Sequence, residues 1–258
     1  MAKFKTDEEI VLLRESGRRL AQVLEEVKKA TIPGVSTGEL DQLSYRLIKE
    51  MGDEAPFFNY QPAGASKPFP AAICISINDE IVHGIPSFER IVEDGDIVSL
   101  DLGVSHNGMI TDAAITVAVG EVSQKITTLL AETERALYEG INAIKVGGRI
   151  GDISAAIEKV ANKNGYGIVR ELGGHGVGHK VHEDPHIPNY GHKGNGPILK
   201  KNMVLAIEPM FMLGKEGILL MPDGYTVVTE DESLSAHFEH TIVITDSGPE
   251  IVTLSDRS

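Results

Sequence analysis

Two apolar segments with one central carboxylate each flank an Asn-Gly dipeptide within residues 97–117. Asn107-Gly108 is typical of a tight β-hairpin, because both central residues of a type I′ turn need positive φ. Side chains alternate between the two faces of a strand, so this turn puts Asp101 and Asp112 on the same face. The sequence therefore predicts two carboxylates that are held side by side among aliphatic neighbours.

Such a pair of carboxylates needs a neutralising partner. Two ions in apolar surroundings lose hydration energy and repel each other, so either one is protonated or both hold a cation. Glu208 and Glu239 also lie inside or at the edge of apolar β-type segments. Any one of these acids could face solvent from a sheet, but charged side chains are rarely buried unpaired. A metal centre would account for all four.

Histidines add a second set of candidate ligands. His175, His179 and His182 lie in a glycine-rich segment, residues 173–182, whose backbone can approach a ligand closely. We expect at least one of the three to bind metal or substrate, although each alone could be an ordinary surface residue. A phosphate-binding loop is excluded here, because the Gly-Lys-Ser/Thr ending is absent. His83 could contact substrate or be held by backbone carbonyls.

Composition narrows the possible partners. The 258-residue chain carries a formal net charge of −14, which argues against nucleic acid as a specific partner. Its single cysteine permits neither an intrachain disulfide nor a thiolate zinc cluster, which fits a reducing compartment. The N-terminus lacks the apolar region of a signal peptide, and no segment approaches the length of a membrane span. We therefore expect a cytoplasmic protein without membrane contact.

The apolar patterns predict helices and strands in a mixed order. Periodicity near 3.6 residues favours helices over about residues 7–29, 37–51, 124–146 and 152–164. Strand-like composition covers residues 71–86, the hairpin, 204–210 and 238–244, with a second hairpin across Asp223-Gly224. Residues 53–70 are rich in Pro, Gly and Ala, which indicates a long connection.

The two predicted helix pairs resemble each other at an offset of 113 residues. Gly34, Gly38 and Gly52 match Gly147, Gly151 and Gly165 at this spacing. An internal duplication would explain the match, and no linker-like segment separates the halves. We therefore predict one domain over residues 1–258, made of two similar halves, about residues 1–120 and 121–258.

Five ordered motifs resemble a known enzyme family. They are Asn78–Pro86, Asp101 eleven residues before Asp112, Gly174–Gly178, Ile207–Met210 and Glu239–Thr241. Together they resemble the short, bacterial-type methionine aminopeptidases of the pita-bread metallopeptidase superfamily. The resemblance implies an α+β pita-bread fold, with two pseudo-symmetric halves whose helices pack on a curved antiparallel sheet.

The resemblance also implies a dinuclear metal centre with five ligands. Asp112 and Glu239 would bridge two divalent ions. His175 and Glu208 would complete the first ion, and Asp101 would bind the second. An oxygen-rich set with one imidazole suits Mn²⁺ or Fe²⁺, and Co²⁺ or Zn²⁺ can also fit.

The activity implied is removal of N-terminal methionine, with a preference for a small second residue. Activated water would attack the peptide while Glu208 transfers its proton, His182 binds the carbonyl oxygen and His83 contacts the peptide or the departing amine. The substrates would be peptides and nascent-protein N-termini. The enzyme would be a monomer and would associate with the ribosome. The methionine pocket would be formed by Phe69, Cys74, Val181 and Tyr225.

Two departures from the family pattern bear on this pocket. Family members commonly have a tyrosine near Ser66 and an aromatic residue at the position of Val181, so the pocket here could be wider or closed differently. Two other functions stay open: an aminopeptidase of the same superfamily with another specificity, such as proline at the second position, and a binding module that has lost catalysis.

Overall fold

The computed structural model describes residues 4–254. The helices in this part of the chain are α1 (Asp7–Ala30), α2 (Thr37–Glu50), α3 (Gln124–Asn142) and α4 (Ile150–Asn164). The strands are β1 (Ile73–Ile77), β2 (Glu80–Val82), β3 (Ile97–His106), β4 (Met109–Ala118), β5 (Gly167–Ile168), β6 (Gly173–Gly176), β7 (Glu183–Pro188), β8 (Val204–Ile207), β9 (Met210–Met212), β10 (Ile218–Leu220), β11 (Val227–Thr229), β12 (Ser235–His237), β13 (His240–Thr245) and β14 (Gly248–Ile251). None of the described helices is long and apolar enough to cross a membrane.

Helices α1, α2 and α3 begin where the capping signals predict, α4 begins two residues before the predicted Asp152, and α3 ends earlier than expected. Thr6 and Ser36 each form a capping box with the glutamate three residues later, which satisfies otherwise unpaired N–H groups. Helix α3 ends at Asn142, so the prediction of helix over residues 143–146 is wrong. Beyond it the helical pattern gives way to a turn in which the Ile144 N–H donates to the Ile141 carbonyl at 3.0 Å, and the Gly147 N–H then donates to the carbonyl of Leu199 at 2.8 Å.

The two helix pairs have corresponding starting points and corresponding hydrogen bonds. Helix α2 begins at Thr37 and α4 at Ile150, which differ by the offset of 113 that the glycines suggested. The Gly34 N–H donates to the Val92 carbonyl at 2.8 Å, as the Gly147 N–H does to Leu199. A common origin of the two halves stays a prediction.

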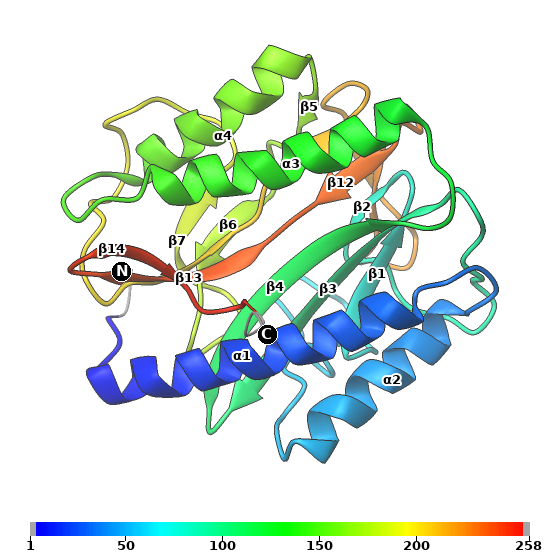
Figure 1. Cartoon of the computed structure of the whole chain (residues 1–258), viewed down its shortest axis with the longest axis horizontal. Coiled ribbons are helices and arrows are strands. Elements are labelled where there is room, and N and C mark those ends of the chain that lie inside the picture. The colour runs from blue at the N-terminus through cyan, green and yellow to red at the C-terminus, as the bar shows by residue number, and fades with distance from the viewer. Residues whose placement is uncertain (1–3, 255–258) are drawn as a thin grey trace.

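Antiparallel strands lie between the helix pairs in Figure 1. The expected curved sheet is divided among four hydrogen-bonded sheets with the orders β1-β3-β4, β10-β11-β2, β12-β9-β5 and β14-β13-β8-β6-β7. The first helix, α1, packs on β3 and β4, whereas α3 packs on α4 and on β12. Two large apolar clusters result, one between α1, α2 and the first sheet and one between α3, α4 and the later strands.

A hydrogen-bonded seam joins strand β4 to residues 237–241. The Thr241 hydroxyl accepts from the Asp112 N–H at 2.9 Å and donates to the Asp112 carbonyl at 2.7 Å. The Thr116 hydroxyl makes the same pair of bonds with His237, at 2.9 and 2.7 Å. Between them, the backbones of Ala114 and Glu239 exchange bonds of 3.3 and 2.8 Å. The hydroxyls of Thr116 and Thr241 thus take the place of the backbone groups that would complete an antiparallel ladder.

Replacing Thr241 with Val should destabilise the fold without changing the shape of the side chain. The Asp112 N–H and carbonyl would both lose their partner in a fully buried setting, at a cost of about 2–4 kcal/mol. Denaturant unfolding measures the loss. Thr128→Val is the control, because Thr128 lies exposed on α3. An equal effect of the two substitutions would show that the seam bonds add nothing.

Candidate metal centre

The β3-β4 hairpin places its two aspartates on one face, as its turn predicts. Asn107 and Gly108 adopt φ values of 49° and 82°. In the register that follows, Asp101 lies opposite Ala114, and Asp112 lies two positions nearer the turn on the same strand as Ala114. Both aspartates are buried, with 8 % and 3 % of their surface exposed.

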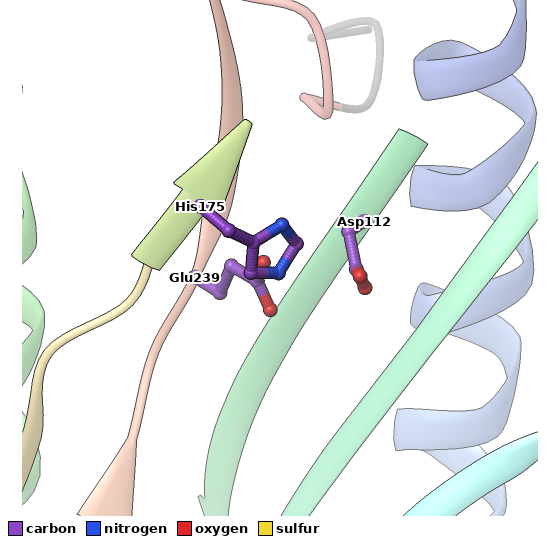
Figure 2. A group of neighbouring side chains, drawn as sticks. All are labelled: Asp112, His175 and Glu239. Atoms are coloured by element: carbon purple, nitrogen blue, oxygen red, sulfur yellow. The ribbon is translucent and has the colours of Figure 1, made fainter. Parts of the chain in front are cut away.

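Three strand segments from the second half of the chain bring the other candidates to the hairpin. His175 lies on β6, Glu208 directly follows β8, and Glu239 lies in the seam between β12 and β13. Figure 2 shows the side chains of Asp112 on β4, His175 on β6 and Glu239 on the segment between β12 and β13, gathered around one space. Their ligand atoms lie within 4.8 Å of one another, close enough to share a metal ion.

One cavity of about 170 Å³ is lined by the five expected metal ligands, by His83 and His182, and by the four expected pocket residues. It is lined by Phe57, Tyr60, Pro62, Phe69, Cys74, His83, Asp101, Asp112, His175, Val181, His182, Glu208, Tyr225 and Glu239. A more open cleft of about 610 Å³ shares His83, His175, His182 and Glu208 with this cavity. The cavity thus has a carboxylate-rich end, an apolar end and a route to solvent.

Burial strongly perturbs the acids. Burial raises the pKa of Asp112 to about 7, and burial together with the charge of Asp112 raises the pKa of Glu208 to about 8. For Asp101 and Glu239, burial followed by repulsion from neighbouring acids raises the pKa well above the usual range. The cluster is therefore unstable as a set of bare anions.

The unpaired atoms of the cluster match what a cation needs. Within the described part of the chain, Asp101 Oδ1, Asp112 Oδ1 and Glu239 Oε1 are buried without a hydrogen-bond partner. Buried polar atoms normally have partners, so several unpaired carboxylate oxygens around one cavity indicate a site for a cation. Oxygen donors of this kind suit divalent metal ions.

His175 has the form that a metal ligand requires. Its Nδ1–H donates to the Gly176 carbonyl at 2.9 Å, which leaves Nε2 with a free lone pair. Nε2 lies 3.4 Å from Glu208 Oε1. Burial, with a further contribution from the charge of His182, lowers the pKa of His175 to about 3, so the ring is neutral at physiological pH.

Of the other predicted histidines, His83 and His182 line the cavity and His179 does not. His83 has a φ of 61°, which is uncommon outside glycine and often found at functional sites. The His182 ring packs against His175, with centroids 4.4 Å apart. His179, by contrast, does not line the cavity, and its Nε2 lies 2.7 Å from Glu9 Oε1.

Two residues at this site were missed by the sequence reasoning. Tyr60 lies in the segment that was predicted only as a connection, and its hydroxyl is 2.9 Å from His182 Nδ1. His237 lies at the end of β12 beside Glu208. Neither residue belongs to a spaced motif. The only signal for Tyr60 was that family members commonly have a tyrosine near the position of Ser66, which lies six residues later.

The apolar end of the cavity contains the four residues expected there. Phe69, Cys74, Val181 and Tyr225 are all buried and belong to one apolar cluster. The rings of Phe69 and Tyr225 meet edge to face, with centroids 5.2 Å apart. Ser66 is exposed and does not line the cavity. The tyrosine that lines it is Tyr60, which lies six residues earlier in the chain.

Comparison with known proteins identifies the family. The sequence model of metallopeptidase family M24 matches residues 11–246 of the chain. The chain belongs to metallopeptidase family M24. This membership confirms the family expected from the motifs and agrees with the candidate metal-binding cluster of Asp112, His175 and Glu239.

Relatives that match this M24 protein over nearly their whole length are named methionine aminopeptidases. The chain is 46% identical to methionine aminopeptidase 1 of Bacillus subtilis over 249 residues, which cover 96% of this chain and 98% of the relative. It is 43% identical to methionine aminopeptidase of Clostridium acetobutylicum over 256 residues, which cover 99% of this chain and 100% of that one.

Solved structures confirm the expected pita-bread fold. Methionine aminopeptidase from Thermotoga maritima superimposes with a TM-score of 0.95 at 40% identity, covering 99% of this chain and 100% of that one. Prolidase from Pyrococcus furiosus matches with a TM-score of 0.79 at 24% identity. That match covers 98% of this M24 chain but 66% of the prolidase, and it shows the shared fold alone.

The metal-free protein should lose stability between about pH 6.5 and pH 8. An acid whose pKa is raised by folding keeps its proton in the folded state and releases it on unfolding, so stability falls as pH rises, by about 1.4 kcal/mol per pH unit for each proton. Buried histidines with lowered pKa values, such as His175, act in the opposite direction, but only below their unfolded pKa near 6.5. Above it, the four buried carboxyls with raised pKa values, those of Asp101, Asp112, Glu208 and Glu239, dominate.

Thermal melts of chelator-treated protein across this interval measure the effect. Metal-loaded protein is the control, since ligated carboxylates have no proton to release and the decline should disappear. A melting temperature of the chelated protein that stays level or rises from pH 6.5 to pH 8 would contradict the raised pKa values.

Proposed function

We propose that the chain is a metal-dependent methionyl aminopeptidase that removes N-terminal methionine from peptides and nascent proteins, preferring a small second residue. The observation that carries this proposal is the single cavity in which orphaned carboxylate oxygens face an apolar pocket. Relatives that match over nearly their full length and are named methionine aminopeptidase support it.

Five residues would hold two divalent ions. Asp112 and Glu239 are central to the cluster and would bridge the ions. His175 and Glu208, whose Nε2 and Oε1 lie 3.4 Å apart, would complete one site, and Asp101 would complete the other. The donor set favours Mn²⁺ or Fe²⁺ and also admits Co²⁺ or Zn²⁺. When bound, such ions activate a water molecule and polarise the scissile carbonyl.

The surrounding residues of the chain would handle the proton and the substrate. Glu208 lies where cavity and cleft meet, so its carboxylate is placed to accept a proton and pass it to the departing amine. His182 would donate to the carbonyl oxygen as negative charge builds there. His83, at the same junction, would contact the peptide or the departing amine.

The apolar end of the cavity would select the residue to be removed. The whole cavity, metal-binding end included, has a volume of about 170 Å³, so its apolar end can take at most one side chain, and Phe69, Val181 and Tyr225 offer apolar walls. A pocket of this kind selects mainly by size and surface. The aliphatic Val181 in place of an aromatic residue leaves this wall less bulky than the family pattern.

The wider setting follows from the same function. Nascent-protein N-termini as substrates would place the enzyme in the cytoplasm and in contact with the ribosome. We expect it to act as a monomer and as one domain whose halves, residues 1–120 and 121–258, both contribute to the site. Neither a membrane nor a specific nucleic acid is expected as a partner.

Purified protein should release methionine from Met-Ala-Ser when loaded with Mn²⁺, Fe²⁺ or Co²⁺, and a chelator should abolish the activity. His175→Ala should lower activity by several orders of magnitude because it removes a ligand, while the melting temperature of the metal-free protein changes little. Product release measured by chromatography, together with metal analysis of anaerobically purified protein, tests both expectations.

The negative outcome is equally specific. A metal-loaded sample that binds peptides or RNA without cleaving any member of a Met-Xaa-Ser panel would favour a binding module. Equal activity of the wild type and His175→Ala would remove the proposed ligand role. Cleavage confined to peptides with proline at the second position would point to the other specificity of the superfamily.

Tyr60→Phe should lower kcat/KM for Met-Ala-Ser by about tenfold, the equivalent of one hydrogen bond of about 1.4 kcal/mol. The hydroxyl of Tyr60 fixes the ring of His182 through Nδ1, and the phenyl ring would keep the apolar contacts. Metal affinity should not change. Tyr45→Phe is the control, since Tyr45 lies exposed on α2, and full activity of Tyr60→Phe would contradict a positioning role.

A further inference from the structure

His237 is a buried histidine for which the proposed mechanism has no use. It is 1% exposed, and neither ring nitrogen has a hydrogen-bond partner among the described residues. A buried polar group without a partner costs about 1–3 kcal/mol, and this ring leaves two such atoms. An imidazole placed in this way calls for a functional explanation.

The ring of His237 points at two of the carboxylates in the cluster. Nε2 lies 3.7 Å from Glu208 Oε2 and 4.0 Å from Glu239 Oε2. The other oxygen of Glu208, Oε1, lies 3.4 Å from His175 Nε2. The Glu208 carboxylate therefore lies between two imidazoles, one at each oxygen.

The backbone of His237 is fixed on two sides. Its N–H and carbonyl are both bound by the Thr116 hydroxyl in the seam. On its other side, His237 is paired with Met210 of β9, two residues after Glu208. Its Cα position relative to Glu208 is thus set by two strands, and a small shift of the carboxylate would bring Oε2 within hydrogen-bond distance of Nε2.

Carboxylates that bind metal need donors behind them. Residues that donate to a ligating carboxylate fix its orientation, and their loss typically lowers metal affinity about 10–100-fold. Glu208 and Glu239 point into the same cavity, and ordered carboxylates repel each other unless a donor or a cation lies between them. An Nε2–H on His237 would be such a donor for both Glu208 and Glu239.

We propose that His237 is a positioning residue that donates its Nε2–H to Glu208 Oε2 and holds Glu208 and Glu239 in their metal-binding orientation. This inference rests on the proposed metal centre. It assigns the second oxygen of Glu208 to the protein, so that Oε1, on the side of His175, is the oxygen turned toward the metal.

Three variants test the inference through metal binding as well as activity. His237→Leu should weaken Mn²⁺ or Co²⁺ binding, measured by calorimetry, about 10–100-fold. Its kcat should fall more than its KM changes. His237→Gln retains an N–H donor and should stay within a few-fold of the wild type. His240→Leu is the matched control, because the His240 ring bonds Thr253 and packs against Tyr138, away from the cavity.

Stability separates positioning from a merely structural role. Metal-free His237→Leu should melt at or above the wild-type temperature, since it removes two unpaired polar atoms, whereas His240→Leu should melt lower and bind metal normally. The Co²⁺ absorption spectrum of His237→Gln should match that of the wild type.

Two results would overturn the inference. Wild-type metal affinity in His237→Leu would show that the ring does not act on the carboxylates. An equal loss in His237→Leu and His237→Gln, with an altered Co²⁺ spectrum, would make His237 a direct ligand instead. Failure of the proposed function itself is distinguishable, because the wild type would then bind no metal and cleave no peptide.

Discussion

The seam between β4 and residues 237–241 is the constraint on which the site depends. Thr116 and Thr241 each bind both backbone groups of the opposing residue, so the register between the two halves is fixed without a regular ladder. Asp112 and Glu239 lie on this seam, one from each half of the chain. The pair Asp112 and Glu239 of the candidate metal-binding cluster is therefore positioned by hydrogen bonds within the chain itself.

The buried carboxylates of this cluster lower the stability of the metal-free fold. Burial raises the pKa of every carboxyl in it, and three oxygens have no partner within the described residues. The apolar clusters on either side supply the stability that the cluster lacks. Because burial destabilises these carboxylates as bare anions and a bound cation would relieve that cost, metal affinity and metal-free stability oppose each other.

The sequence predicts those parts of the site that local rules determine. The Asn107-Gly108 turn fixes the shared face of Asp101 and Asp112, and the apolar periodicity places the helices, apart from the early end of α3. His179 and His182 look equivalent in the sequence, yet only His182 reaches the cavity, since Glu9 of α1 engages His179. Tyr60 and His237 depend on contacts between distant segments, which no spacing rule in a single sequence reveals.

The two connected spaces explain why such an enzyme would remove one residue at a time. The smaller cavity, of about 170 Å³, ends in the walls formed by Phe69 and Tyr225 and can take one side chain. The larger cleft, of about 610 Å³, begins at His83 and Glu208 and has room for the chain that follows. A peptide that enters amino end first can advance only until its first side chain fills the small cavity. The carboxylates and His175 would then face the first peptide bond, as removal of a single N-terminal residue requires.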